Sequence, residues 1–338
     1  MARPIAVVGA GSWGTTLAWL LAEKGLSVRL WCRDRKRASA MRAARENRRY
    51  LPGVRLPDAL VPEADLTAAA AGAELLLLAV PTQAVGPLLA ELAAAAATAP
   101  LLCAAKGLER PGGRRMSQVI ESAAGGRWRD AFALLSGPNL AGEVVRRLPT
   151  ATVVASPDPA LARRCQELLA TDFLRVYTNP DVIGVELGGA LKNVIAVGAG
   201  ISDGLGYGDN SKAALITRGL AEMVRLATAC GARPETLYGI SGLGDLVATC
   251  GSPLSRNHTL GVRLGRGEML AQILTALDQV AEGVPTTEAA HHLARAAGIE
   301  MPITAEMYAV LYQDKPPAEA VATLMGRPHR DEGRESQG

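Results

Sequence analysis

Ile5-Ala6-Val7-Val8-Gly9-Ala10-Gly11-Ser12-Trp13-Gly14 is the stretch that decides the fold of the first half of this chain. Its apolar start, Ile5–Val8, is typical of a buried strand, and the GxGxxG element that follows opens a segment with helical apolar spacing. In such an element the first glycine makes the turn, the second lets the backbone approach a pyrophosphate, and the third lets helix and strand pack closely. The first amides of the helix hold the anion. We therefore predict a dinucleotide site, rather than a glycine-rich turn without ligand, at Gly9, Gly11, Ser12, Trp13 and Gly14.

Short apolar runs and helix-like segments alternate through the first 180 residues or so. The apolar runs lack strict alternation, as expected for strands buried on both faces; they are Ile5–Val8, Ser27–Trp31, Glu74–Val80, Leu101–Ala104, Ala131–Leu135, Thr150–Ala155 and Phe173–Val176. The helix-like segments are Ser12–Lys24, Arg35–Asn47, Val85–Ala97, Met116–Ala123 and Asp158–Ala170. This order predicts a Rossmann-type α/β domain with a mostly parallel, doubly wound sheet.

After residue 181 the strand pattern stops and the apolar spacing becomes helical throughout. Glycines and prolines separate the predicted helices, which are Val185–Gly200, Lys212–Cys230, Arg233–Tyr238, Leu243–Thr249, Gly267–Val280, Thr287–Gly298, Thr304–Tyr312 and Ala318–Met325. We therefore expect three parts: a dinucleotide-binding domain over 1–188, an all-α substrate-binding domain over 189–326, and a frayed tail over 327–338.

The composition limits the classes of function. Of the 338 residues, 49% are hydrophobic and the net charge is only +3, which excludes a disordered chain and does not favour a nucleic-acid partner. Five cysteines form no CxxC pair, so we predict reduced thiols in a cytoplasmic protein, and no cluster of side chains has the spacing of metal ligands. We predict no signal peptide, because the apolar stretch Ile5–Ala22 contains three glycines and lacks a clear cleavage site. We predict no membrane insertion, because Lys192 interrupts the apolar run Leu187–Ile201.

The end of the second predicted strand bears on the choice of cofactor. Asp34 lies twenty residues after Gly14, where an acidic side chain would accept the ribose 2′-hydroxyl of NAD. Arg33 comes first, however, and a guanidinium at this place could hold the 2′-phosphate of NADP. We predict that the protein accepts NADP and also NAD, with NADPH preferred.

Lysine is scarce in this chain, since only 6 of the 36 basic residues are lysines, so each lysine is worth examining. Lys106 follows a predicted strand, at the edge where doubly wound sheets bind ligands. Lys192 lies in a glycine-rich helical segment, although each glycine costs roughly 1 kcal/mol of helix propensity, which indicates a packing or binding reason. Lys212 could simply lie in the first turns of a helix.

Taken together, an ordered set of motifs covers nearly the whole chain. It consists of the glycine turn with Trp13, Asn47-Arg48-Arg49-Tyr50-Leu51-Pro52, Ala79-Val80-Pro81, Lys106-Gly107, Leu135-Ser136-Gly137-Pro138, the 185–201 stretch, Gly208-Asp209-Asn210, the 213–219 stretch, Gly242-Leu243-Gly244-Asp245-Leu246, Ser255-Arg256-Asn257 and Ala281-Glu282-Gly283. Because of these motifs and their order, the sequence resembles the bacterial NAD(P)-dependent glycerol-3-phosphate dehydrogenases. One departure is Asn139, where the family usually has Ser or Thr.

The resemblance implies an oxidoreductase that reversibly reduces dihydroxyacetone phosphate to sn-glycerol 3-phosphate, which supplies glycerophospholipid synthesis. It implies that Lys192 donates and accepts the proton, with Lys106 and Asp245 as further catalytic residues. The implied substrate-binding residues are Lys106, Gly137, Asn139, Lys192, Asn193, Asp245, Thr249, Ser255, Arg256 and Asn257. The implied cofactor contacts, beyond the glycine turn and Arg33, are Lys106, Ala141, Arg256, Val280 and Glu282.

The residues alone are also compatible with two other functions. One is another reductase of this architecture, such as a ketopantoate reductase or a 3-hydroxyacid dehydrogenase. The other is an NAD(P)-binding regulator without turnover, although such a protein has no need of a proton donor. An Ala-rich helical domain also allows a homodimer.

Overall fold

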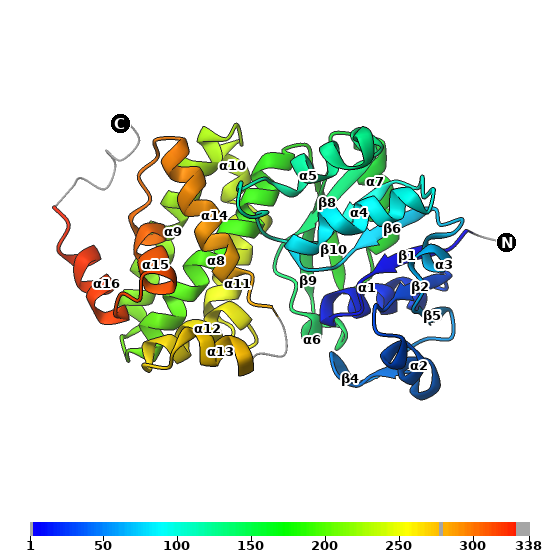
Figure 1. The fold of residues 1–338 in the computed structure, drawn as a ribbon, viewed down its shortest axis with the longest axis horizontal. Coiled ribbons are helices and arrows are strands. Elements are labelled where there is room, and N and C mark those ends of the chain that lie inside the picture. The colour runs from blue at the N-terminus through cyan, green and yellow to red at the C-terminus, as the bar shows by residue number, and fades with distance from the viewer. Residues whose placement is uncertain (1–2, 277–279, 329–338) are drawn as a thin grey trace. The chain divides into compact units, whose positions relative to one another are not determined.

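A computed structural model of the chain describes residues 3–276 and 280–328. The chain divides into two compact units, one made of Met1–Lys106 with Arg115–Glu186 and the other of Gly107–Arg114 with Leu187–Gly338 (Figure 1). The division lies two residues before the boundary predicted after residue 188. The segment 107–114, which the sequence placed in the first domain, belongs to the second unit, where Arg110 pairs with Glu288. Of the tail predicted over 327–338, residues 329–338 lie outside the described residues.

The first unit is built on an eight-stranded sheet in the order β10-β9-β8-β7-β6-β1-β2-β5. All neighbouring strands are parallel except β8 and β9, which are antiparallel, so the predicted mostly parallel sheet is confirmed. Its strands are β1 (Ile5–Val8), β2 (Val28–Trp31), β5 (Leu60–Glu63), β6 (Leu75–Leu78), β7 (Leu101–Cys103), β8 (Phe132–Ser136), β9 (Thr150–Ala155) and β10 (Leu174–Asn179). A separate antiparallel pair is formed by β3 (Glu46–Asn47) and β4 (Leu51–Arg55).

Helices cover both faces of this sheet, which is why its strands carry apolar residues at consecutive positions. Alternate residues of β1 show this: Ile5 and Val7 belong to one buried core, and Ala6 and Val8 belong to the other. The elements that complete the unit are α1 (Ser12–Glu23), α2 (Arg35–Ala44), α3 (Leu66–Ala70), η1 (Thr82–Ala84), α4 (Val85–Ala94), α5 (Met116–Ser122), η2 (Ala123–Gly126), α6 (Ala141–Val144) and α7 (Pro159–Leu169).

One prediction in this unit was wrong, and several short elements were not predicted. The helix expected over 35–47 ends at Ala44, because Arg45 has a left-handed backbone (φ 52°), and the following residues form β3 instead. The strand β5 was not predicted; it contains Pro62, which is tolerated there because β5 lies at the edge of the sheet. The short elements β4, α3 and α6 were also missed.

The second unit is helical, as predicted. It contains most of α8 (Val182–Gly204), α9 (Asp209–Ala229), α10 (Pro234–Leu237), the π-helical turn η3 (Ile240–Gly244), α11 (Asp245–Gly251), α12 (Arg256–Gly265), α13 (Leu270–Ala276), α14 (Gly283–Ala296), α15 (Pro302–Tyr312) and α16 (Pro317–Met325). The helix α12 was not predicted, and the one expected over 267–280 is described only as α13, because residues 277–279 lie outside the described residues.

The glycines of α8 have a packing reason. A Cβ on Gly200 would lie 2.1 Å from the backbone oxygen of His258 in α12, and a Cβ on Gly261 would lie 2.1 Å from the oxygen of Val197 in α8. The backbones of α8 and α12 therefore cross in direct contact. By length and composition α8 could span a membrane, but 83% of its apolar window is buried, as in the core helix of a soluble protein.

Candidate active site

The glycine turn between β1 and α1 has the geometry of a phosphate cradle. Gly9 has φ +117°, and a Cβ there would lie 2.4 Å from the backbone oxygen of Ala79; a Cβ on Gly14 would lie 1.9 Å from the oxygen of Gly9. At Gly11 a Cβ would meet no atom within 4 Å, so the middle of the turn is open. Gly11 is also the N-cap of α1 and offers its first amides no side-chain acceptor. These features fit a bound pyrophosphate.

The segment between β3 and β4 supports this turn. Ser12 Oγ donates to the carbonyl oxygen of Tyr50 at 2.7 Å. Asn47 is buried, and its Nδ2 donates to the oxygen of Ala10 at 3.1 Å and to Thr15 Oγ1 at 2.8 Å. Trp13 Nε1 is buried without a hydrogen-bond partner among the described residues. The Asn47–Tyr50 segment thus fixes the turn from outside the strand–turn–helix element.

At the end of β2, Arg33 and Asp34 differ in what they can offer a ligand. Asp34 caps α2, because its Oδ1 accepts from the amides of Lys36 at 2.9 Å and Arg37 at 3.1 Å. These hydrogen bonds hold the pKa of Asp34 below its ordinary value, and the one from the Arg37 amide has the largest effect. The side chain of Arg33 is exposed. Asp34 is exposed as well, so both residues are open to a ligand, although Asp34 Oδ1 already accepts from the two amides of α2.

A second group of predicted residues lies at the carboxyl ends of β7 and β8. Lys106, which follows β7, donates from Nζ to the oxygen of Gly137 at 2.6 Å, and Gly137 directly follows β8. Asn139 Nδ2 donates to Thr152 Oγ1 at 3.2 Å, and Ala141 is the first residue of α6. The first unit therefore brings Lys106, Gly137 and Asn139 to the sheet edge where ligands bind in this fold.

In the second unit, Lys192 is held in a buried polar group. Its Nζ donates to Asp245 Oδ1 at 2.8 Å and to Thr249 Oγ1 at 2.7 Å, and Thr249 Oγ1 lies 3.2 Å from Asp245 Oδ1. Lys192 is 7% exposed and Asp245 is 2% exposed. Asp245 and Thr249 lie one turn apart on α11, so both face the same point of α8. Burial raises the pKa of the neighbouring Cys250 thiol to about 12, which keeps that cysteine neutral and unreactive.

The predicted phosphate segment begins α12. Ser255 caps that helix, since its Oγ accepts from the amide of His258 at 3.3 Å. Asn257 Nδ2 donates to Asn193 Oδ1 at 2.7 Å, and Asn257 Oδ1 accepts from the amide of Gly283 at 2.9 Å. Asn257 therefore joins α8, α12 and α14, and its side-chain amide group has a second Nδ2 hydrogen with which it can donate.

Arg256 is the residue of this segment whose side chain reaches the loop before α14. Its Nη1 donates to the carbonyl oxygen of Val280 at 2.9 Å, and it is close enough to Glu282 for an electrostatic interaction. The structure therefore brings together Arg256, Val280 and Glu282, three residues for which the resemblance implies contact with the cofactor.

Sequence reasoning missed a cluster next to this segment. Asp203 Oδ2 on α8 accepts from Lys212 Nζ on α9 at 2.8 Å and lies 2.7 Å from His258 Nε2 on α12. Because a carboxylate only accepts, Nε2 of His258 carries the proton. Lys212 does lie in the first turn of α9, as one reading held. The scarcity of lysine pointed to Lys212, but no local signal pointed to a partner that is distant in sequence.

A second unforeseen cluster lies in the first unit, where α8 begins. Glu186 accepts from Arg115 Nη1 at 2.5 Å, from the Ser117 amide at 3.1 Å and from Ser117 Oγ at 2.8 Å. Burial raises the pKa of Glu186, and the charge of Arg115 acts against this. Glu186 thus fixes the first turns of α8 to the start of α5. Within the described residues, no three His, Cys, Asp or Glu side chains gather as metal ligands would.

A Rossmann-type sheet with an open glycine turn, followed by a helical unit that buries a lysine beside a carboxylate, defines the class of NAD(P)-dependent dehydrogenases. Comparison with known families specifies the member of this class. Residues 4–162 match the N-terminal part, and residues 181–322 the C-terminal part, of the family described as NAD-dependent glycerol-3-phosphate dehydrogenase. The chain belongs to this family and is an NAD(P)-dependent oxidoreductase.

Similar proteins agree with this assignment. The chain is 52% identical to a glycerol-3-phosphate dehydrogenase [NAD(P)+] of Geobacter sulfurreducens, over 97% of this chain and 98% of that protein. It is 50% identical to the protein of the same name from Geobacillus kaustophilus, over 97% and 96%. The crystal structure of glycerol-3-phosphate dehydrogenase from Coxiella burnetii has a TM-score of 0.92 and 41% identity, covering 96% of this chain and 99% of that one.

Proposed function

We propose that this protein catalyses the reversible reduction of dihydroxyacetone phosphate to sn-glycerol 3-phosphate, with Lys192 as the proton donor and acceptor. The observation that carries this proposal is the position of Lys192 Nζ, 2.8 Å from Asp245 Oδ1 and 2.7 Å from Thr249 Oγ1. A buried lysine fixed by two oxygen partners is oriented before substrate arrives, which is what a proton-transfer group requires.

The chemistry explains why a lysine is suited to this position. A bound nicotinamide dinucleotide supplies a hydride to the carbonyl carbon, or removes one from the alcohol carbon. In the reduction, the substrate oxygen gains negative charge, and the Lys192 ammonium stabilises that charge and donates a proton to it. In the oxidation, neutral Lys192 takes the proton back. Asp245 and Thr249 keep Nζ in place in both directions, whereas a guanidinium could not exchange the proton.

The remaining predicted residues have two proposed tasks. For the substrate, Arg256 provides the cation that binds the phosphate, together with Ser255 and Asn257. Around the reacting end we place Lys106, Gly137, Asn139 and Asn193. For the cofactor, the glycine turn takes the pyrophosphate and Arg33 the 2′-phosphate of NADP, which favours NADPH. Further cofactor contacts are proposed at Lys106, Ala141, Arg256, Val280 and Glu282.

The setting of the reaction is also a proposal. The five cysteines are all free thiols and four of them are buried, which supports a reducing compartment, the cytoplasm. There we expect the product to supply glycerophospholipid synthesis. We propose a small phosphorylated ketone as substrate, a homodimer as the working form, and neither nucleic acid nor membrane insertion.

The test is the decay of NADPH absorbance by the purified protein with one ketone at a time. We expect oxidation with dihydroxyacetone phosphate and none with ketopantoate or a 3-ketoacid. Turnover of ketopantoate alone would assign the protein to another reductase. NADPH binding without turnover of any of these ketones would indicate a regulator and refute the proposal.

A further inference from the structure

A buried histidine directly follows the proposed phosphate-binding residues, and no step of the proposed reaction uses it. His258 comes after residues 255–257 at the start of α12 and is 9% exposed. His258 Nε2 lies 2.7 Å from Asp203 Oδ2 of α8, and the same oxygen accepts from Lys212 Nζ of α9 at 2.8 Å. Side chains of three helices therefore meet at one carboxylate oxygen beside the start of α12.

The carboxylate of this cluster is ionised and held in one orientation. Burial acts to raise the pKa of Asp203, but the hydrogen bonds from Lys212 and His258 outweigh it and hold this pKa below its ordinary value. The side chains of Asp203 and Lys212 are each about one quarter exposed, and ion pairs near the surface contribute little to the stability of a fold. The more important consequence of the cluster is therefore the fixed orientation of the His258 ring.

The helix α8 carries both this carboxylate and the proposed proton donor. Asp203 lies three helical turns after Lys192, so the two side chains leave α8 on nearly the same side. At 1.5 Å per residue, they are roughly 16 Å apart along the helix axis. Any group that Asp203 holds is therefore held at a set distance from Lys192.

Backbone contact alone does not fix the position of α12 along α8. The two helices meet at glycines: a Cβ on Gly204 of α8 would lie 2.3 Å from the backbone oxygen of Val262, and one on Gly265 of α12 would lie 2.6 Å from that of Ile201. Interlocked side chains are what normally set the position of one helix on another, and glycine has none to offer. The position of α12 therefore depends on polar side chains beside this contact.

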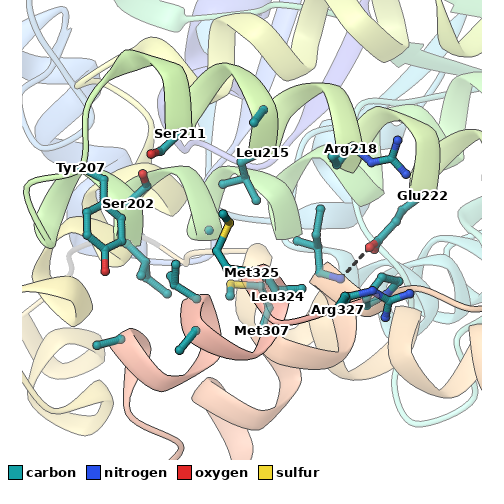
Figure 2. A pocket seen from close by; sticks show the side chains of 18 of the residues that line it. Ser202, Tyr207, Ser211, Leu215, Arg218, Glu222, Met307, Leu324, Met325 and Arg327 are labelled. Carbon is teal, nitrogen blue, oxygen red and sulfur yellow. Dashed lines mark hydrogen bonds between the residues drawn. The ribbon is translucent and has the colours of Figure 1, made fainter. Parts of the chain in front are cut away.

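On the side toward α9, α8 borders open space. Ser202, next to Asp203, and Ser211, next to Lys212, both line a groove between α8, α9, α15 and α16. Figure 2 shows these two serines at the same end of the groove. Ser202 Oγ is buried without a hydrogen-bond partner among the described residues. The Asp203 carboxylate, bonded to Lys212, therefore connects α8 and α9 at the edge of this groove.

Two side-chain hydrogen bonds join the start of α12 to α8. Asn257 Nδ2 donates to Asn193 Oδ1 at 2.7 Å, and Asn193 is the neighbour of Lys192. His258 donates to Asp203 three turns further along α8. Because the two bonds lie far apart on α8, together they prevent α12 from sliding along it or turning on it.

We propose that His258, oriented by Asp203 and Lys212, is a positioning residue that sets the distance between residues 255–257 and Lys192. This inference rests on the proposed function, in which residues 255–257 bind the phosphate and Lys192 exchanges a proton with the substrate oxygen. A fixed distance between these two groups selects ketones by the number of carbons between carbonyl and phosphate. Dihydroxyacetone phosphate has one such carbon, and its homologue 4-hydroxy-3-oxobutyl phosphate has two.

Two substitutions of His258 separate positioning from a merely structural role. The amide nitrogen of glutamine can take the place of Nε2, so His258→Gln keeps a donor to Asp203, whereas the shorter side chain of His258→Asn cannot reach it. Initial rates with each ketone at saturating NADPH give kcat and KM. In His258→Asn, kcat/KM for dihydroxyacetone phosphate should fall about 10–100-fold, because the phosphate and the proton donor lose their fixed distance.

The homologue supplies the readout that a loss of stability would not change. In His258→Asn, its kcat/KM should change by less than about threefold, so that the variant discriminates less between the two ketones than the wild type does. The KM for NADPH should stay the same. His258→Gln should keep the wild-type discrimination. His291→Asn is a further control, because His291 of α14 stacks on Tyr308 and has no proposed role in the site.

A double variant tests whether Asp203 acts through His258. Asp203→Ala should give the same selective loss as His258→Asn, and the double variant should lose no more than either single variant, because all three lack one and the same hydrogen bond. Circular dichroism checks that each variant is folded. Losses that add up in the double variant would show that the two residues act independently and would overturn the proposal.

The other contrary results are also distinct. Equal losses with both ketones in His258→Asn would indicate a structural role only, and so would a loss in His258→Gln as large as that in His258→Asn. Either result, obtained with a wild-type protein that reduces dihydroxyacetone phosphate, overturns this inference and leaves the proposed function intact. A wild-type protein that oxidises NADPH with neither ketone would refute the proposed function and this inference with it.

Discussion

Lys192 Nζ lies 2.8 Å from Asp245 Oδ1, and both side chains are almost completely buried. Taking two charges out of water costs a desolvation free energy that can exceed their mutual attraction, so a buried pair of this kind contributes little to the stability of a fold. Thr249 adds a third polar atom to it at 2.7 Å from Nζ. The arrangement is more readily explained by chemistry at Nζ than by stability alone.

The first prediction concerns the proton donor. Lys192→Ala should lower kcat by about 10²–10⁴-fold, because the substrate oxygen then lacks its proton donor. NADPH should still bind, as measured by quenching of tryptophan fluorescence. Lys315→Ala is the matched control, since Lys315 pairs with Glu306 and has no proposed role in the site. Near-normal turnover of Lys192→Ala would remove the catalytic role.

The second prediction concerns the choice of cofactor. Arg33→Ala should raise the KM for NADPH about tenfold and leave the KM for NADH nearly unchanged. The reason is that only NADPH carries the 2′-phosphate that would lose its contact with Arg33. Initial rates with both cofactors measure this. Arg266→Ala, which removes an exposed arginine of the second unit, serves as the control. Equal increases for the two cofactors would contradict a phosphate contact at Arg33.

The third prediction concerns the substrate phosphate. Arg256→Ala should raise the KM for dihydroxyacetone phosphate by about 10²-fold, since a charge-assisted bond to the dianion is lost. Arg256→Lys keeps the charge but not the planar fork, so it should recover part of this loss. The KM for unphosphorylated dihydroxyacetone should change far less, because this ketone has no phosphate to contact Arg256. A KM for the phosphorylated ketone that does not change in Arg256→Ala would place the phosphate elsewhere.

The fourth prediction concerns the crossing of α8 and α12. Gly200→Ala should destabilise the protein by about 1–3 kcal/mol or more, because the new Cβ would meet the backbone oxygen of His258, which cannot move alone. Urea unfolding measures the difference. Gly251→Ala, at the end of α11, adds a Cβ that meets nothing within 4 Å and should leave stability unchanged or slightly raised. Similar midpoints for the two variants would show that the helices separate without cost.

The sequence predicted the sheet and the helical unit well because buried strands and amphipathic helices leave local patterns. It did not predict α12, and the reason lies in Gly261 and Gly265, which lower helix propensity but are needed where α12 crosses α8. Lys192 attracted attention because lysine is scarce in a chain whose basic residues are mostly arginine. Its hydrogen bond to Thr249 spans 57 residues, and the contact between Asp203 and His258 spans 55. No local pattern encodes such pairs.

The last prediction concerns a buried carboxyl, Glu222 of α9. It accepts hydrogen bonds from the amide of Ile303 at 2.5 Å, from the amide of Thr304 at 3.1 Å and from Thr304 Oγ1 at 3.0 Å, and so holds the first turn of α15. Burial raises the pKa of Glu222 from 4.5 to about 7, against the effect of these donors. The folded protein therefore binds this proton more tightly than the unfolded chain does.

The sign of the pH dependence follows from linkage. Between pH 4.5 and about 7 the folded state holds more protons at Glu222, so this group's contribution to the free energy of unfolding falls as pH rises and is constant above about pH 7. At ~1.4 kcal/mol per pKa unit, the full change is at most about 3 kcal/mol. Urea unfolding from pH 5 to 8 should show this decrease in the wild type, and Glu222→Gln, which cannot titrate, should make it smaller. Glu186, whose pKa burial also raises, contributes a decrease of the same sign that remains in this variant. Glu319→Gln on the exposed face of α16 is the control, and a decrease of undiminished size in Glu222→Gln would assign the titration to another group.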